Sequence, residues 1–351
     1  MSISLEPRNS IQKEVSRLKI FVVGNSRSGT TMMARILGNH PDICVFHEVH
    51  FFEQLWSPDE KDKSLSTSDA LSLAALLIGK HREGYFSRIN PYEYMGAAKE
   101  IVSSIKDDTL TAVKVYAAFH RYETLLKGKR IPCEQTPQNV FYIGEILELF
   151  PEARVINMIR DPRDVLLSQK WKWKRHFLGA KNIPLLEAFR CRTNYHPITI
   201  SKLWNAAVTA GDRYDKDTRV FSLRFEDLLQ NPAEELRKIC KFIGISYDNN
   251  LLLVPQVGSS SETDKTVKKG INKSKTGNWQ NGGLTSTEIS ISQRITGIFM
   301  QKYNYEIIQT GSHPFGELYY ILSFPVKTAF ALLLNFKRIK NLKETITRRL
   351  S

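Results

Sequence analysis

The stretch VVGNSRSGTT, residues 22–31, decides the fold of this chain. It starts inside an apolar run, residues 19–23, that predicts a short buried strand, and it leads into a predicted helix over residues 30–38. A glycine-bracketed turn between a strand and a helix start leaves backbone N–H groups without intrahelical partners, and the helix dipole adds positive potential. The stretch therefore predicts a phosphate-binding loop.

The loop differs from that of the nucleoside triphosphatases at one informative position. The triphosphatase pattern places a lysine directly after the second glycine, whereas Thr30 follows Gly29 here. The cation of the loop is Arg27 instead. An arginine and a pair of hydroxyl groups suit an anion held without a bridging magnesium ion. The sequence also contains no convincing metal-ligand cluster, so we expect no metal.

Four stretches together resemble the sulfotransferases, and in particular their bacterial and protein-tyrosine branch. They are RSGTT (27–31) with NHPD (39–42) and Glu48, EQTPQN (134–139), RDPRD (160–164) with Ser168, and RFEDLLQNP (224–232). The resemblance covers roughly residues 18–279. It implies an enzyme that transfers a sulfuryl group from 3′-phosphoadenosine 5′-phosphosulfate (PAPS) to an acceptor hydroxyl and releases 3′,5′-adenosine bisphosphate.

The resemblance also implies roles for individual residues. Arg27 would hold the 5′-phosphosulfate and stabilise charge on the leaving group, together with the amides of Ser28, Gly29, Thr30 and Thr31. Arg160 and Ser168 would bind the 3′-phosphate, for which a bidentate cation and a hydroxyl are suited.

Glu48 lies 21 residues after Arg27, the spacing of the catalytic glutamate in the protein-tyrosine branch, and is the general-base candidate. Burial beside the transferred group would raise its pKa toward a useful range. The competing interpretation is a structural ion pair between Glu48 and a lysine. His47 and His50 are weaker candidates for the base.

The chain departs from the family pattern at Gln135, where a lysine is usual. Lys114 or a lysine of a later loop would then supply that charge. The later loop, residues 254–281, is rich in glycine, serine and lysine, and its ending, GNW at residues 277–279, resembles the family's nucleotide-closing loop. We expect Lys273 and Lys275 to bind the nucleotide; the alternative is a solvated loop.

Composition narrows the class of protein. The chain has 351 residues, 42% of them hydrophobic and 25% charged, which is typical of a globular protein. Its net charge of +14 predicts an anionic partner. The first residues lack a signal-peptide pattern, and the four cysteines lack disulfide or metal spacing, so a reducing, cytoplasmic location is expected.

Alternating strand and helix patterns predict an α/β, P-loop-type fold of three layers, with a mostly parallel central sheet flanked by helices. The expected strands cover residues 19–23, 43–52, 110–116, 153–160 and 219–224, and the expected helices residues 30–38, 67–82, 91–104, 139–150, 162–177, 198–214, 232–242 and 286–303. We divide the chain into a polar tail (1–17), a nucleotide-binding catalytic domain (18–311) and an apolar, basic C-terminal segment (312–351).

Two segments remain ambiguous. KWKWKR, residues 170–175, interleaves aromatic and basic residues, as nucleic-acid and anionic-sugar sites do, but equally fits a solvated helix face with its tryptophans packed inward. The apolar residues 318–336, followed by a basic tail, would lie on an anionic membrane or pack against the catalytic core.

The sequence thus predicts a PAPS-dependent sulfotransferase and no nucleic-acid partner. Its acceptor stays open among saccharides, lipids, small alcohols and peptide tyrosine. Two alternatives are a P-loop kinase, which Thr30 and the Arg160–Ser168 pair disfavour, and a non-catalytic, membrane-associated protein that binds nucleotides or other anions, which Gln135 and the positive charge favour.

Overall fold

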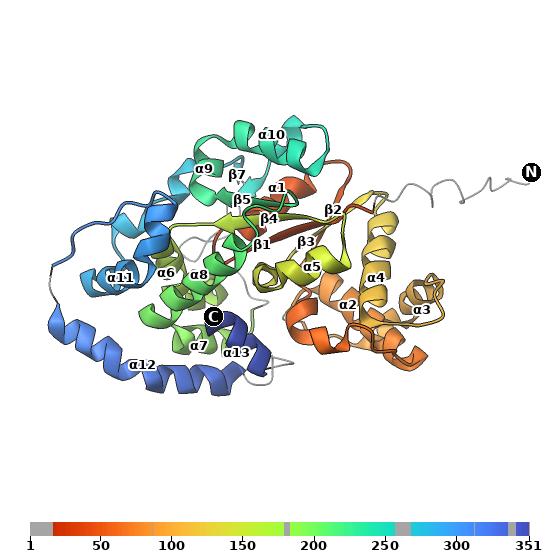
Figure 1. Ribbon diagram of the computed structural model, residues 1–351, viewed down its shortest axis with the longest axis horizontal. Helices are drawn as coiled ribbons and strands as arrows, with labels where there is room; N and C mark the ends of the chain where they lie inside the picture. The colour runs from red at the N-terminus through yellow and green to blue at the C-terminus, as the bar shows by residue number, and fades with distance from the viewer. Residues whose placement is uncertain are drawn as a thin grey trace, which may run out of the picture.

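A computed structural model describes residues 17–85, 87–178, 183–256, 268–311, 313–335 and 342–350 of the chain. Its centre is a five-stranded sheet in the order β2-β3-β1-β4-β5, with every neighbouring pair parallel. The strands are β1 (Ile20–Gly24), β2 (Ile43–Phe46), β3 (Ile131–Gln135), β4 (Arg154–Ile159) and β5 (Val220–Arg224). Helices lie on both sides of the sheet, as Figure 1 shows, and the predicted fold class is confirmed.

Helices alternate with these strands along the chain. They are α1 (Thr30–Gly38), α2 (Thr67–Glu83), α3 (Met95–Ser103), α4 (Ala112–Leu126), α5 (Ile143–Leu149), α6 (Pro162–Lys170), α7 (Leu185–Asn194), α8 (Pro197–Asp212), α9 (Phe225–Gln230), α10 (Pro232–Ile243), α11 (Ser286–Lys302), α12 (Pro314–Asn335) and α13 (Leu342–Leu350). The helices predicted at residues 30–38, 67–82, 198–214, 232–242 and 286–303 are confirmed within two residues at each end.

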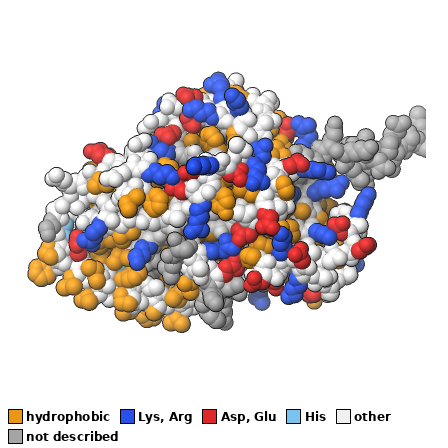
Figure 2. Space-filling view, in the orientation of Figure 1, with side chains coloured by type: hydrophobic (Ala, Val, Ile, Leu, Met, Phe, Trp, Pro, Cys, Tyr) orange, Lys and Arg blue, Asp and Glu red, His pale blue; other side chains and the backbone are white. Residues whose placement is uncertain are grey.

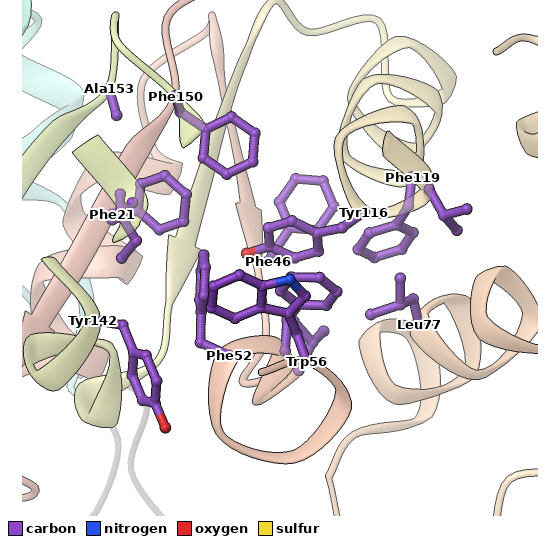
Figure 3. Packing of buried hydrophobic residues seen from close by; sticks show 14 of the residues in the cluster. Phe21, Phe46, Phe52, Trp56, Leu77, Tyr116, Phe119, Tyr142, Phe150 and Ala153 are labelled. Carbon is purple, nitrogen blue, oxygen red and sulfur yellow. The ribbon is translucent and has the colours of Figure 1, made fainter. Parts of the chain in front are cut away.

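The two faces of the sheet carry separate hydrophobic cores. Alternate residues of β1 enter different cores, because side chains on a strand point to opposite faces: Phe21 joins one core, and Val22 joins the other. The first core is strongly aromatic, and Figure 3 shows Phe21, Phe52, Trp56 and Tyr116 among its members. Both faces of β1 are therefore buried, which fixes the position of the loop that follows it.

One predicted strand is wrong, and one strand of the central sheet, β3, was not predicted. Residues 110–116, expected as a strand, lead into helix α4, which Thr111 caps by accepting a hydrogen bond from the Lys114 amide at 3.3 Å. Val115 and Phe119, four residues apart, lie on the buried side of this helix. The strand beside β1 is β3 instead, whose sequence IPCEQ contains a proline and two polar residues that hide the strand pattern.

Three other boundaries differ from the prediction. The strand expected over residues 43–52 ends at Phe46, and the helix expected over residues 139–150 forms as a 3₁₀ helix, Pro137–Tyr142, followed by α5. The helix expected over residues 162–177 ends at Lys170 and gives way to a second 3₁₀ helix, Lys172–Leu178. Lys172 and Arg175 of this 3₁₀ helix line the cavity described below.

Gly24 and Gly29 are required by space and by backbone conformation. Gly24 has φ +139°, and a Cβ on it would lie 2.3 Å from the carbonyl oxygen of Met158 on β4. Gly29 has φ +93°, and a Cβ there would lie 2.3 Å from the ring of Phe225. The glycines at both ends of the loop thus let β1 and α1 approach their neighbours closely.

We predict that Gly24→Ala costs far more stability than Gly128→Ala. Gly128 also has positive φ, +64°, but a Cβ on it meets nothing within 4 Å. The Gly128 substitution should therefore cost only about 1–2 kcal/mol of backbone strain, whereas Gly24→Ala adds a clash with backbone and should cost about 3 kcal/mol or more. Urea unfolding of the two variants measures this, and equal losses would show that Gly24 has no special packing role.

Candidate functional site

The loop after β1 has an unusual backbone. Arg27 has φ +76°, a left-handed conformation that is costly for a residue with a side chain. The Ser28 amide donates to the Asn25 carbonyl at 3.1 Å, which closes the turn. Gly29 then occupies the N-cap of α1 without offering a side chain, so the first amides of the helix are left to a ligand.

A cavity of about 790 Å³ opens over this loop, at the carboxyl ends of the strands. Ligands bind at this edge in open parallel sheets. The loop after β1, the last residue of β3, and the residues that follow β4 and β5 all reach it. Its lining includes Arg27, Gly29, Thr30, Thr31, Glu48, His50, Gln135, Arg160, Lys172, Arg175, Phe225 and Arg349.

The two predicted phosphate sites lie side by side. Arg27 Nε donates a hydrogen bond to Ser168 Oγ at 2.8 Å. Arg160 Nη1 donates to the carbonyl of Arg27 at 3.2 Å. The loop after β1 and the segment after β4 are thus joined directly, although they lie more than 130 residues apart in sequence.

The electrostatics of this junction suit an anion. Burial, followed by the nearby charges of Arg160 and Arg175, lowers the pKa of Arg27 to about 10, so the guanidinium stays protonated at neutral pH while its neighbours repel it. Ser28 Oγ and Arg160 Nε are buried and have no hydrogen-bond partner among the described residues. Unsatisfied buried donors and crowded cations are both costly, and one bound anionic group would relieve both.

The late basic loop is fixed to the second motif at its end. Asp164 accepts hydrogen bonds from the amides of Gly277 and Trp279 at 2.9 and 3.0 Å, and Arg160 Nη2 donates to the Lys275 carbonyl at 2.8 Å. Lys273 is exposed and Lys275 is half-buried, and neither belongs to the cavity lining. Residues 257–267 of this loop lie outside the described part of the chain.

Glu48 is held between two partners at the edge of the cavity. Gln135 Nε2 donates to Glu48 Oε1 at 3.1 Å and lies 3.2 Å from Thr30 Oγ1. On the other side His50 Nε2 lies 3.2 Å from Glu48 Oε2. About a third of the Glu48 side chain, 35%, remains exposed. Among the described residues, the basic partner of Glu48 within 4 Å is His50 and not a lysine, as the competing interpretation expected.

The protonation of this pair differs from the expectation. Burial favours a raised pKa for Glu48, but the hydrogen bond and charge of His50, then Gln135, outweigh it and hold the Glu48 pKa below its usual value. Burial likewise disfavours protonated His50, yet its contacts with Glu48 and Glu53 raise the His50 pKa to about 9. The predicted upward shift of the Glu48 pKa is therefore wrong, and protonated His50 is a poor base at neutral pH.

This network continues to the end of the chain. Glu53, whose Oε2 lies 3.6 Å from His50 Nδ1, forms an ion pair with Arg349 on α13. The neighbouring Arg348 pairs with Glu145 and Glu344. Arg348 and Arg349 of the basic tail thus bind carboxylates of the protein itself, and not a membrane surface as expected.

Beyond Arg27 and Arg160, the cavity lining contains six cations that the sequence did not assign to the site: Arg35, Arg82, Lys172, Arg175, Arg190 and Arg349. The charge of Lys172 helps to lower the Glu48 pKa. Lys114, expected to replace the family lysine, instead donates to the Thr109 carbonyl at 2.9 Å and pairs with Asp107. The alternation of aromatic and basic residues in KWKWKR was the available signal for Lys172 and Arg175.

The EQTPQN motif, residues 134–139, contributes one residue to the buried core and another to the cavity. Glu134 is fully buried and accepts hydrogen bonds from Tyr116, from Thr136 Oγ1 at 2.9 Å and from Asn139 Nδ2 at 3.1 Å. These bonds fix the end of β3. Because successive side chains on a strand alternate, Gln135 then points to the cavity.

The profile of the sulfotransferase family matches residues 19–249 of the chain, well over half of its length. The chain belongs to the sulfotransferase family. It is 26% identical to the nodulation protein NoeE of Sinorhizobium fredii over 249 residues. The matched region covers 68% of this chain and 52% of NoeE. It is 23% identical to a protein-tyrosine sulfotransferase of Drosophila melanogaster over 248 residues. This matched region covers 66% of this chain and 39% of that protein.

The chain therefore spans about half, or less, of the length of these curated relatives. Among solved structures, the sulfotransferase domain of the Synechococcus PCC 7002 olefin synthase aligns with a TM-score of 0.49 and 18% identity, over 80% of this chain and 94% of that domain.

We predict that His50→Asn destabilises the protein in a pH-dependent way. Asparagine tolerates the left-handed backbone of His50, φ +51°, so the substitution tests the side chain. Because the folded-state pKa is raised from 6.5 to about 9, the stabilisation is fully present below pH 6.5 and disappears as the pH rises through about 9. The free-energy gap to wild type should shrink over that range.

Unfolding free energies at a series of pH values measure this gap. His47→Asn is the control, since burial, followed by the charge of Lys127, lowers the His47 pKa. A lowered pKa gives no stabilisation that disappears as the pH rises through about 9, so the gap for His47→Asn should not shrink there. If the gap for His50→Asn does not change with pH, His50 does not carry the charge assigned to it.

Proposed function

We propose that the chain transfers the sulfuryl group of PAPS to an acceptor hydroxyl. The observation that carries the proposal is the junction of Arg27, Arg160 and Ser168, with unpaired Ser28 Oγ and Arg160 Nε. Arg27 and Arg160 line the cavity that also contains Glu48, and the two serines lie behind its lining. In the reaction the acceptor oxygen forms a bond to sulfur, the bond between sulfur and the 5′-phosphate oxygen breaks, and the acceptor loses a proton.

Two groups of residues would hold the donor. Arg27 and the amides that begin α1 would bind the 5′-phosphosulfate, because they offer a protonated guanidinium and helix N–H groups that no side chain caps. Arg160 and Ser168 would bind the 3′-phosphate. Their positive charge would also stabilise the negative charge that develops on the leaving group.

Glu48 would take the proton of the acceptor. It lines the cavity, and its lowered pKa keeps it ionised at neutral pH. Its oxygens are oriented by Gln135 and His50. A base of low pKa accepts protons weakly, so positioning and the nearby charge of Lys172 would have to contribute much of the rate.

A second function is favoured by one observation. Gln135 occupies the position where the family usually has a lysine, and it donates to Glu48. This arrangement fits a protein that binds the nucleotide without transferring sulfate. A kinase fits less well, because the residue after Gly29 is a threonine and not the phosphate-binding lysine.

We predict that 3′,5′-adenosine bisphosphate raises the melting temperature much more than AMP at the same concentration. AMP lacks the phosphate assigned to Arg160 and Ser168, and each charge-assisted contact should contribute on the order of 1.5–3 kcal/mol. In Arg160→Gln the difference between the two nucleotides should nearly vanish. Equal shifts in the wild-type protein would refute the 3′-phosphate assignment.

We predict that Glu48→Gln slows sulfate transfer by about 10²–10⁴-fold, the cost of losing a general base. The glutamine keeps the shape of the side chain, so affinity for 3′,5′-adenosine bisphosphate should barely change. The assay follows release of this product from PAPS with saccharide, phenol and lipid alcohols as acceptors. A Glu48→Gln variant of normal rate would place the base elsewhere, and nucleotide binding without turnover in the wild type would favour the non-catalytic function.

A further inference from the structure

The outer side of α12 carries a long stripe of exposed apolar residues that continues onto α7. On α12 they recur three or four residues apart, as on one face of a helix, and they are Phe315, Leu318, Tyr319, Leu322, Val326, Phe330 and Leu333. On α7 they are Leu185, Leu186 and Phe189, and α7 and α12 lie in contact. We call this set the α7–α12 surface; Figure 2 shows hydrophobic side chains gathered along α12.

By length and composition α12 could cross a membrane, and among the described helices it alone meets that test. It is nevertheless fixed along the protein. Glu317 near its start pairs with Arg294, Ser323 in its middle lies 3.2 Å from His196, and Asn335 at its end lines the cavity. A helix about 33 Å long that is tied at its start and in its middle, and that lies along α7 and α8, presents its apolar stripe sideways. This geometry suits lying on a surface.

The charge around the stripe identifies the kind of surface. The 3₁₀ helix Lys172–Leu178 and helices α7 and α12 together contain six lysines and arginines and two glutamates. Three of the cations line the cavity, which leaves Lys174, Arg192 and Lys327 outside its lining. Both glutamates, Glu187 and Glu317, are paired with arginines. A second copy of the chain would bring like charges together, whereas anionic lipid headgroups complement them.

We propose that the α7–α12 surface docks the protein on an anionic membrane, with its apolar stripe buried at the level of the headgroups. The same two helices line the cavity, through Ala188 and Cys191 of α7 and Asn335 of α12. Docking therefore brings the cavity next to the lipid. Docking itself does not depend on sulfuryl transfer. If the proposed function holds, docking implies that the acceptor hydroxyl belongs to an amphipathic lipid, and this part of the proposal rests on the proposed function.

The test is co-sedimentation of the full chain with vesicles of phosphatidylcholine alone or mixed with phosphatidylglycerol. Leu322→Asp with Leu333→Asp alters residues that are 66% and 75% exposed, and Ile298→Asp with Tyr92→Asp, at 82% and 84% exposure elsewhere, is the matched control. The wild type and the control should bind the phosphatidylglycerol vesicles, less so at high salt. The Leu322 and Leu333 variant should bind about tenfold more weakly or worse.

Three results would overturn the proposal. The first is that the wild type does not sediment with phosphatidylglycerol vesicles, and the second is that both double variants bind them equally well. The third is that the wild type forms a concentration-dependent dimer that only the Leu322 and Leu333 variant loses, which would make the surface a contact between copies of the chain. Affinity for 3′,5′-adenosine bisphosphate, measured on every variant, shows that each is folded. If the wild type binds vesicles but not the nucleotide, the proposed function is contradicted and the docking proposal is still supported.

Discussion

The hydrogen bond from Arg27 Nε to Ser168 Oγ is the interaction on which the site depends. It joins the loop after β1 to helix α6, which follows β4, and Arg160 strengthens the junction by donating to the Arg27 carbonyl. The parallel pairing of β1 with β4 makes this contact available, because it brings both strand ends to one edge of the sheet. The strained backbone of Arg27 and the close approach at Gly24 are costs that this arrangement imposes on the loop.

A second chain of contacts, from Gln135 through Glu48 and His50 to Glu53 and Arg349, gives the cavity its opposite wall. Carboxylates and cations alternate along it, so each charge is balanced by its neighbours. The balance explains why Glu48 stays ionised although it is largely enclosed. It also makes the C-terminal helix α13 part of the site, which gives the final residues of the chain a role in its geometry.

The local sequence was sufficient to predict the loop after β1, helix α1 and the start of α6. Glycine spacing, apolar runs and an Asp–Pro helix start each act over only a few residues. The local sequence failed at β3, whose strand character comes from its place between β1 and β2 and not from its own composition. The lowered pKa of Glu48 and the contributions of Lys172 and Arg349 depend on partners brought together by the fold. The alternation in KWKWKR was a signal for Lys172, but no spacing in the sequence encodes the lowered Glu48 pKa or the contact of Arg349.

The most direct test of the account is a double-mutant cycle on nucleotide binding. Calorimetry would give the affinity for 3′,5′-adenosine bisphosphate in wild type, Arg27→Ala, Ser168→Ala and the double variant. If the two side chains form one site, Ser168→Ala should weaken binding about tenfold or more in the wild type and clearly less once Arg27 is gone, a coupling of about 1 kcal/mol or more. Strictly additive effects would contradict the claim that the two motifs form a single anion-binding unit.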